Sequence, residues 1–258
     1  MSAPTPLLEF FKRGEVARDV RLLAAEGALA PRASEQLAIL VLLLEDPDPE
    51  IRQVADATLN RIPLEALQGF LGRADVPIGL REFFADRGVF PSEIPTIVAD
   101  DPLVEAAGDD DDDLGDENAD RESVNQRITK MGFSARLKAA VKGTREVRSI
   151  LIRDPNKMIA ASVLSSPKVS ESEIESYARM ANVSEDVLRI IGQNRAWMKN
   201  YGVMLGLTKN PKTPLGMSMN LMSRLNDRDL GQLSVDRNVP EALRIAARKK
   251  ILSSTSKR

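Results

Sequence analysis

Two short stretches decide the fold of this chain: LIRDPNK at residues 151–157 and LTKNPKT at residues 207–213. The offset that places Pro155 on Pro211 also places Asn182-Val183 on Asn238-Val239, and we call it the long period. Self-similarity at a fixed period is typical of helical repeat proteins, whose copies stack because one copy cannot bury its apolar face alone. The sequence is therefore predicted to contain a repeated unit.

A third copy lies earlier in the chain. The shift that aligns Asp46-Pro47 with Asp154-Pro155 predicts copies over 31–88, 134–193 and 194–252. One position is shared by ADVPIGLRE, ANVSEDVLRI and RNVPEALRI, and we expect it to hold a buried Leu with an Arg on its flank. The three pairs are Leu80-Arg81, Leu188-Arg189 and Leu243-Arg244, the last aligned after skipping one residue.

Each copy carries the signals of short helices. The Asp-Pro and Asn-Pro steps predict helix ends, because a residue before Pro is pushed out of helical geometry. Thr213 is expected to be an N-cap with Pro214 in the first turn, and Ser170 and Glu173 have the spacing of a capping box. Alternating β-branched runs and Asn-Gly hairpins are missing from the sequence. The chain is predicted to be all-α, with about four helices in each copy.

Two segments suggest a family. DPDPEIRQVADATL, residues 46–59, resembles the second helix of a HEAT repeat. The stretch from Asn210 to Ile251 is similar to helical repeats of the leucine-rich-variant kind in uncharacterised bacterial proteins. The resemblance implies an α-solenoid of about three helical repeats that binds partners through a concave or ridge surface. It supplies no catalytic residues.

The composition argues against several classes of protein. Cys and His are both absent, which removes disulfides, thiol nucleophiles and the usual general base and metal ligand. Phosphate loops and serine elbows are also missing, and Asp227 and Asp229 have the positions of helix-capping residues. We expect a cytoplasmic protein that is not an enzyme and has no catalytic residue, metal or cofactor. The longest apolar run, LAILVLLL, is shorter than the roughly 20 residues that span a bilayer.

The charges divide the chain in two. Residues 106–123 form an acidic, apolar-poor run that predicts a disordered linker between an N-terminal helical domain, 1–105, and a C-terminal one, 124–258. Residues 121–258 hold 26 Lys and Arg against 12 Asp and Glu, while residues 1–120 hold 10 against 26. The near-neutral net charge of −2 therefore conceals an acidic and a basic half.

The basic residues of the C-terminal half follow the repeat. The long period aligns three pairs: Arg153 with Lys209, Lys168 with Arg224 and, after the skip, Arg189 with Arg244. Such columns predict a basic stripe on one surface, and Lys212 lies close to it in the sequence. The alternative is a solvated face that serves solubility and helix C-termini.

The segment NRAWMKNYGVMLG, residues 194–206, contains the only Trp of the chain. Trp197, Tyr201 and Met204 are expected to share one helix face, which is more typical of a core than of a contact surface. The alternative is a ridge of binding hot spots, because Trp, Tyr and Arg concentrate binding energy in interfaces. The polar rim of this ridge would then consist of Lys199, Lys209 and Lys212.

We expect a scaffold or adaptor that binds an acidic or helical segment of another protein through its basic face. Binding of nucleic-acid backbone by the same face is the alternative. A further hypothesis is an internal contact in which the run Asp109 to Asp113 occupies the stripe. Replacing these five residues with Ser should then tighten the binding of an acidic partner at low salt.

Overall fold

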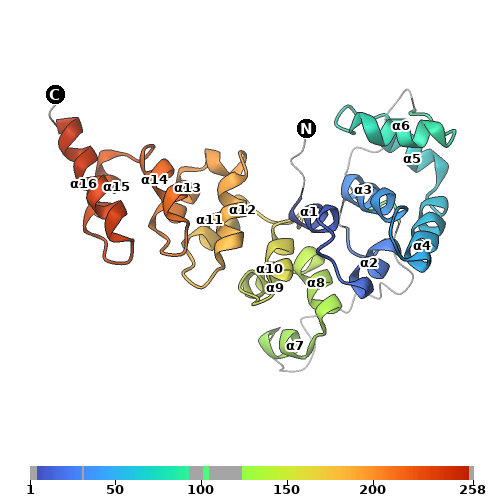
Figure 1. Cartoon of the computed structure of the whole chain (residues 1–258), viewed down its shortest axis with the longest axis horizontal. Coiled ribbons are helices and arrows are strands. Elements are labelled where there is room, and N and C mark those ends of the chain that lie inside the picture. Colours follow the sequence, from blue (N-terminus) through green and yellow to red (C-terminus); the bar gives the residue numbers. More distant parts are fainter. Residues whose placement is uncertain (1–4, 31, 93–100, 105–123, 256–258) are drawn as a thin grey trace. The chain divides into compact units, whose positions relative to one another are not determined.

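The computed structural model describes residues 5–30, 32–92, 101–104 and 124–255. These residues contain sixteen α-helices, one 3-10 helix and no strand, which confirms the all-α prediction for the described part of the chain (Figure 1). None of these helices is long and apolar enough to cross a membrane. The acidic run 106–123, including Asp109 to Asp113, lies outside the described residues, so its predicted role stays a prediction.

The chain forms two compact units. The first comprises Met1–Arg148 and Ser162–Lys168, and the second comprises Ser149–Ala161 and Val169–Arg258. The chain passes between the units three times: within α9 (Arg145–Leu151), within α10 (Lys157–Val163) and between Lys168 and Val169. The predicted domain boundary falls in the acidic run, outside the described residues.

The N-terminal unit is built around α3, whose apolar run is buried on most of its faces. This helix packs against α1, α2 and α4, and α2 also contacts α8. Leu37 and Leu40 of α3 meet a core that includes Ile51 and Phe70, all four of them fully buried. The helices of this unit are α1 (Pro6–Lys12), α2 (Arg18–Ala25), α3 (Ala33–Leu43), α4 (Pro49–Asn60), α5 (Leu64–Leu71), α6 (Ile78–Asp86), α7 (Val124–Lys130) and α8 (Phe133–Lys142).

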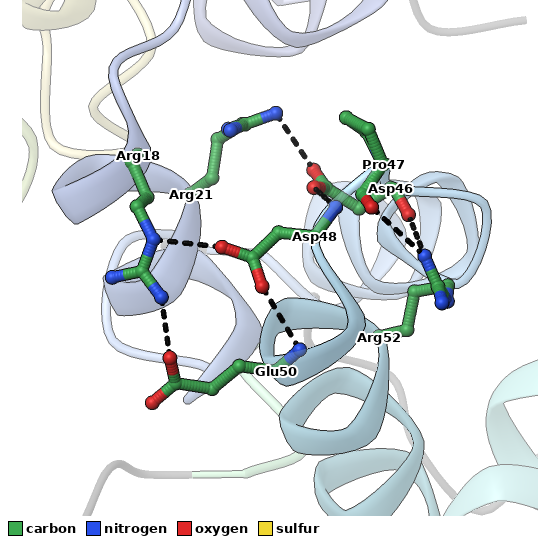
Figure 2. Close-up of polar contacts among 7 residues, drawn as sticks. All are labelled: Arg18, Arg21, Asp46, Pro47, Asp48, Glu50 and Arg52. Atoms are coloured by element: carbon green, nitrogen blue, oxygen red, sulfur yellow. Dashed lines mark hydrogen bonds and ion pairs between the residues drawn. The ribbon is translucent and has the colours of Figure 1, made fainter.

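The connection between α3 and α4 is fixed by ionic contacts (Figure 2). Arg21 of α2 donates to the carboxylate of Asp46 at 3.1 Å, and Arg52 of α4 donates to the carbonyl oxygens of Asp46 and Pro47 at 2.6 and 3.1 Å. The side chain of Asp46 also accepts the N–H of Asp48 at 2.9 Å. A polar loop between two apolar helices is thereby held in one conformation.

Asp48 completes this arrangement at the start of α4. It caps the helix by accepting the N–H of Glu50 at 2.9 Å, and Pro49 follows in the first turn. Arg18 of α2 donates to the carboxylate of Asp48 at 2.7 Å and also contacts Glu50 (Figure 2). The hydrogen bond from Arg18, supported by the N–H of Glu50, holds the pKa of Asp48 below its ordinary value of 3.8.

This lowered pKa predicts a pH-dependent contribution to stability. Because the folded state favours the ionised carboxylate, the contribution is complete above pH 3.8 and is lost as the pH falls through the lower pKa of the folded state. Asn can still cap a helix, so Asp48→Asn removes the charge and keeps the cap. Urea unfolding of both proteins should show that the native chain is more stable at pH 6 and that the difference narrows below pH 4. A difference that is independent of pH would contradict the role of the Arg18 contact.

The C-terminal unit contains a series of helices that follow one another in chain order (Figure 1). Direct packing joins α11 to α13, α13 to α14, α14 to α16 and α15 to α16. After α9 and α10 the elements are α11 (Glu171–Arg179), α12 (Glu185–Gln193), the 3-10 helix η1 (Trp197–Lys199), α13 (Tyr201–Lys209), α14 (Leu215–Met222), α15 (Asp227–Val235) and α16 (Glu241–Thr255). The predicted copies 31–88 and 194–252 contain four α-helices each, whereas 134–193 spans five, α8 to α12.

Candidate functional site

The helix bounds show that the repeated unit of the C-terminal half is a helix pair. Shifting the sequence by the long period aligns both ends of α11 with the ends of α15. The same shift aligns the start of α12 with the start of α16, as the sequence predicts. Between them lies one more pair, α13 and α14. The first helices of the three pairs begin at Glu171, Tyr201 and Asp227, so α13 begins close to the midpoint between α11 and α15. The long period therefore contains two pairs of similar length.

The loops that follow α9, α13 and α15 share one turn. Asp154, Asn210 and Asp236 each accept the backbone N–H two residues further on, at 2.8, 3.0 and 2.9 Å. Such turns suit Asp and Asn because their short side chains hydrogen-bond their own backbone. Two of these residues belong to the Asp-Pro and Asn-Pro steps of the sequence, Asp154-Pro155 and Asn210-Pro211, whereas Asp236 makes the same turn before Arg237.

The second helix of each pair is preceded by a buried residue. Val183 and Val239 are 0 and 4 % exposed, and each lies two positions before its helix. Thr213 occupies the same position and is 4 % exposed, so its prediction as an N-cap is wrong: Pro214 is the N-cap of α14. The predicted capping box of Ser170 and Glu173 is confirmed at the start of α11.

The loops that follow α11, α13 and α15 border a groove of about 710 Å³ in the C-terminal unit. It lies where the carboxyl ends of α11 and α13 approach the loop between α15 and α16. Its lining comprises Arg179, Ala181, Leu205, Gly206, Lys209, Asn210, Pro211, Asp236 and Asn238. The wall is therefore partly apolar and carries two cationic side chains and one carboxylate.

The floor of the groove is formed by α11 and α13, which pack closely. A Cβ atom added to Gly206 would lie 3.2 Å from the Cβ of Ala178 and 3.0 Å from the Cγ of Arg179, so glycine permits this approach. Asn210 is 3 % exposed and joins the two pairs, since its Nδ2 donates to the carbonyl oxygens of Ala178 and Met180 at 2.9 and 3.0 Å. These contacts join the two helices that form the floor of the groove.

The cationic side chains of the groove belong to a column. Arg153, Arg179 and Lys209 lie at the same distance along the chain from the first residues of α9, α11 and α13. Arg179 pairs with Glu175, and the Nζ of Lys209 donates to Gln232 at 2.9 Å. Sequence analysis found Arg153 and Lys209 but missed Arg179, because the long period steps over every second pair. The shorter period of one pair would have found it.

Other predicted partner-binding residues lie outside the groove lining. Lys212 is exposed in the same loop as Asn210, and Arg224 is exposed between α14 and α15. Arg153 is also exposed, and its Nε donates to the carbonyl oxygen of Ser149 at 3.0 Å. Lys168 belongs to the N-terminal unit, where its carbonyl oxygen accepts a hydrogen bond from Arg148 at 3.1 Å.

The predicted equivalence of Arg189 and Arg244 is wrong. The starts of α12 and α16 are separated by the long period, with no residue skipped. The same offset aligns buried Val187 with buried Leu243. Leu188 and Leu243 are both fully buried, as predicted, but they are not equivalent. The third predicted leucine, Leu80, is only half-buried. Arg189 is exposed and pairs with Glu185 at 2.6 Å, whereas Arg244 is half-buried. These two arginines do not form a column.

The predicted common helix face of Trp197, Tyr201 and Met204 is also corrected. Trp197 lies in η1, and Asn200 is extended and caps α13 by accepting the N–H of Gly202 at 2.8 Å, so Tyr201 begins a new helix. Met204 is buried, Trp197 is half-buried and Tyr201 is 37 % exposed.

Tyr201 serves as a link between helices. Its hydroxyl donates to Asp229 at 2.5 Å and accepts the N–H of Asn226, the N-cap of α15, at 3.2 Å. Partial burial, together with the Asp229 carboxylate, raises the pKa of Tyr201. These contacts tie the start of α13 to the start of α15.

Comparisons of the chain with family models, with curated proteins and with solved structures found no match. The function must therefore be inferred from the groove itself. It offers two cations with partners that can be exchanged and an apolar wall, and the one carboxylate of its lining, Asp236, accepts the N–H of Asn238 at 2.9 Å. This set suits a polar, negatively charged chain segment, and the lining contains no Cys or His.

Proposed function

We propose that the protein is a cytoplasmic, non-enzymatic adaptor of HEAT-like helical repeats in a solenoid, and that the groove of its C-terminal unit binds an extended acidic segment of a partner protein. The observation that supports this proposal is the position of Arg179 and Lys209 in one groove beside apolar Leu205. Charged residues near an interface set the choice of partner, and the apolar wall contributes burial.

The geometry suggests the spacing of the acidic residues. Arg179 and Lys209 occupy the same position on α11 and α13, which pack directly. Packed helices lie roughly 8–10 Å apart. An extended peptide in the polyproline II conformation advances about 3.1 Å per residue and has three residues per turn, so side chains three residues apart lie on the same face about 9 Å apart. Carboxylates three residues apart on an extended peptide therefore match the two cations.

The experiment compares three ligands by fluorescence anisotropy at low salt. The first is a labelled peptide containing Glu-Ser-Ser-Glu, the second has the same composition as Glu-Glu-Ser-Ser, and the third is a short DNA duplex. We expect the first peptide to bind about tenfold more tightly than the second, since one charge-assisted contact contributes roughly 1.5 kcal/mol. Equal affinity for both peptides would contradict the matched spacing.

Nucleic-acid binding is the second candidate, and the excess of 26 Lys and Arg over 12 Asp and Glu in residues 121–258 favours it. Phosphate backbone binding depends steeply on salt, because each neutralised phosphate releases counterions. DNA that binds more tightly than either peptide, with a steep salt dependence, would favour this candidate. A pull-down from cell extract with and without nuclease then identifies the natural partner.

A further inference from the structure

The N-terminal unit contains a buried polar residue in α3, Gln36, which is 1 % exposed. Its Nε2 donates to the carbonyl oxygens of Gly27 and Val104 at 3.1 and 2.7 Å. Its Oε1 accepts the N–H groups of Leu103 and Val104 at 2.7 and 3.1 Å. A side-chain amide has two donors and two acceptor positions, so all are used, and three of the four bonds go to residues 103–104.

The segment that receives these bonds is short and distant in sequence. Asp101–Val104, with the sequence DPLV, belongs to no helix, and Val104 lies 68 residues along the chain from Gln36. The side chain of Val104 is buried at 7 % exposure, whereas Asp101 is exposed. One buried amide and one buried valine therefore hold a segment of four residues.

This arrangement has the chemistry of a peptide-recognition site. Bonds to backbone groups hold an extended segment of any sequence, and a pocket for one side chain adds selectivity. Gly27, with φ of +87°, shapes the site, since a Cβ there would lie 3.3 Å from the Nε2 of Gln36 and 3.6 Å from the carbonyl oxygen of Val104. Without the segment, Gln36 would keep only its bond to Gly27. A buried amide that lacks partners is costly, so the site favours an extended occupant.

We propose that the Gln36 site binds short extended peptides of the Pro-Leu-Val type, and that residues 101–104 occupy it as an exchangeable internal ligand. A peptide with the same three residues competes with the internal segment for the same hydrogen bonds and the same valine pocket. The Gln36 site belongs to the N-terminal unit and does not depend on the groove of the C-terminal unit.

The absence of Cys from the chain allows a direct test. Single-cysteine variants of the full chain are labelled with a thiol reagent, and the labelling rates are compared. Val104→Cys is the reporter. Leu40→Cys, in the fully buried core, is the slow reference, and Asp101→Cys, at an exposed position, is the fast reference. If the segment exchanges, V104C reacts more slowly than D101C and more than about tenfold faster than L40C, because local opening is more frequent than global unfolding.

The decisive step adds the capped peptide Gly-Asp-Pro-Leu-Val-Gly. The effective concentration of a tethered segment is on the order of millimolar, so about 10 mM peptide should raise the labelling rate of V104C about threefold or more. The same peptide with Asp in place of Val should leave the rate unchanged, and Gln36→Met should abolish the effect of the first peptide.

A labelling rate of V104C that neither peptide changes overturns the proposal and makes residues 101–104 a fixed part of the fold. Should V104C fail to fold, Leu103→Cys keeps Val104 in place and reports through a half-buried position. The same acceleration by the first peptide is then expected, and its absence has the same meaning.

Discussion

Replacing Arg179 and Lys209 together with Glu is expected to lower the affinity of the C-terminal unit for a Glu-Ser-Ser-Glu peptide by more than about 100-fold. A hydrogen bond to a charged group contributes roughly 1.5–3 kcal/mol, so losing two of them exceeds the roughly 2.7 kcal/mol that corresponds to a factor of 100. The new carboxylates also repel the ligand. Anisotropy titrations at several salt concentrations measure the effect.

The control is a double variant that changes the net charge by the same amount as the first one, but at residues outside the groove lining. Arg228 and Lys249 are exposed residues of the same unit, and Arg228→Glu with Lys249→Glu should weaken binding only through the general field. This effect should be less than about tenfold and should vanish at high salt. Because cations near helix ends also stabilise the helices, urea unfolding must show that both double variants remain folded. Equal losses in the two double variants would mean that net charge, and not the groove, binds the peptide.

Replacing Asn210 with Leu is expected to destabilise the C-terminal unit by about 3 kcal/mol, because each buried polar group left without a partner costs roughly 1–3 kcal/mol. The variant leaves the carbonyl oxygens of Ala178 and Met180 and the N–H of Lys212 without the Asn210 side chain. Trp197 is the only Trp of the chain and belongs to this unit, so its fluorescence during urea unfolding measures the effect.

Two further variants separate the bonds of Asn210 from its volume. Asn210→Asp keeps the acceptor for Lys212 but loses both donors, and we expect it to be destabilised as strongly as Asn210→Leu. Exposed Asn220→Ala should change the free energy of unfolding by less than about 0.5 kcal/mol. A stable Asn210→Asp variant would show that the two pairs are joined by packing alone.

Local signals in the sequence predicted much of the fold. The capping box of Ser170 and Glu173 is confirmed because it depends only on residues three positions apart. The long period is confirmed in the starts of α11 and α15 for a related reason: the repeat preserves helix length and turn chemistry. Thr213 was misassigned because burial, and not capping, decides its position.

The groove could be predicted only in part. Lys209 was found through the repeat, whereas Arg179 was missed because the long period that joins Arg153 to Lys209 steps over the pair α11 and α12, which carries Arg179. Arg244 was placed beside Arg189 by matching the letters Leu-Arg, although burial fixes a different register. Gln36 carried no local signal, because its partners lie 67 and 68 residues away in a segment without secondary structure.

The central claim is that the acidic segment lies in the groove, and disulfide trapping tests it most directly. Ala181 lines the groove, whereas Ala242 is an exposed alanine of the same unit outside the lining. Because the chain contains no Cys, a cysteine introduced at either position is the only thiol of the variant. Disulfides require Cα atoms within roughly 7 Å, so a Glu-Ser-Cys-Glu peptide should cross-link to Ala181→Cys and not to Ala242→Cys. The yield should fall as salt rises. Equal cross-linking at both positions, or cross-linking at Ala242→Cys alone, would contradict the assignment of the groove.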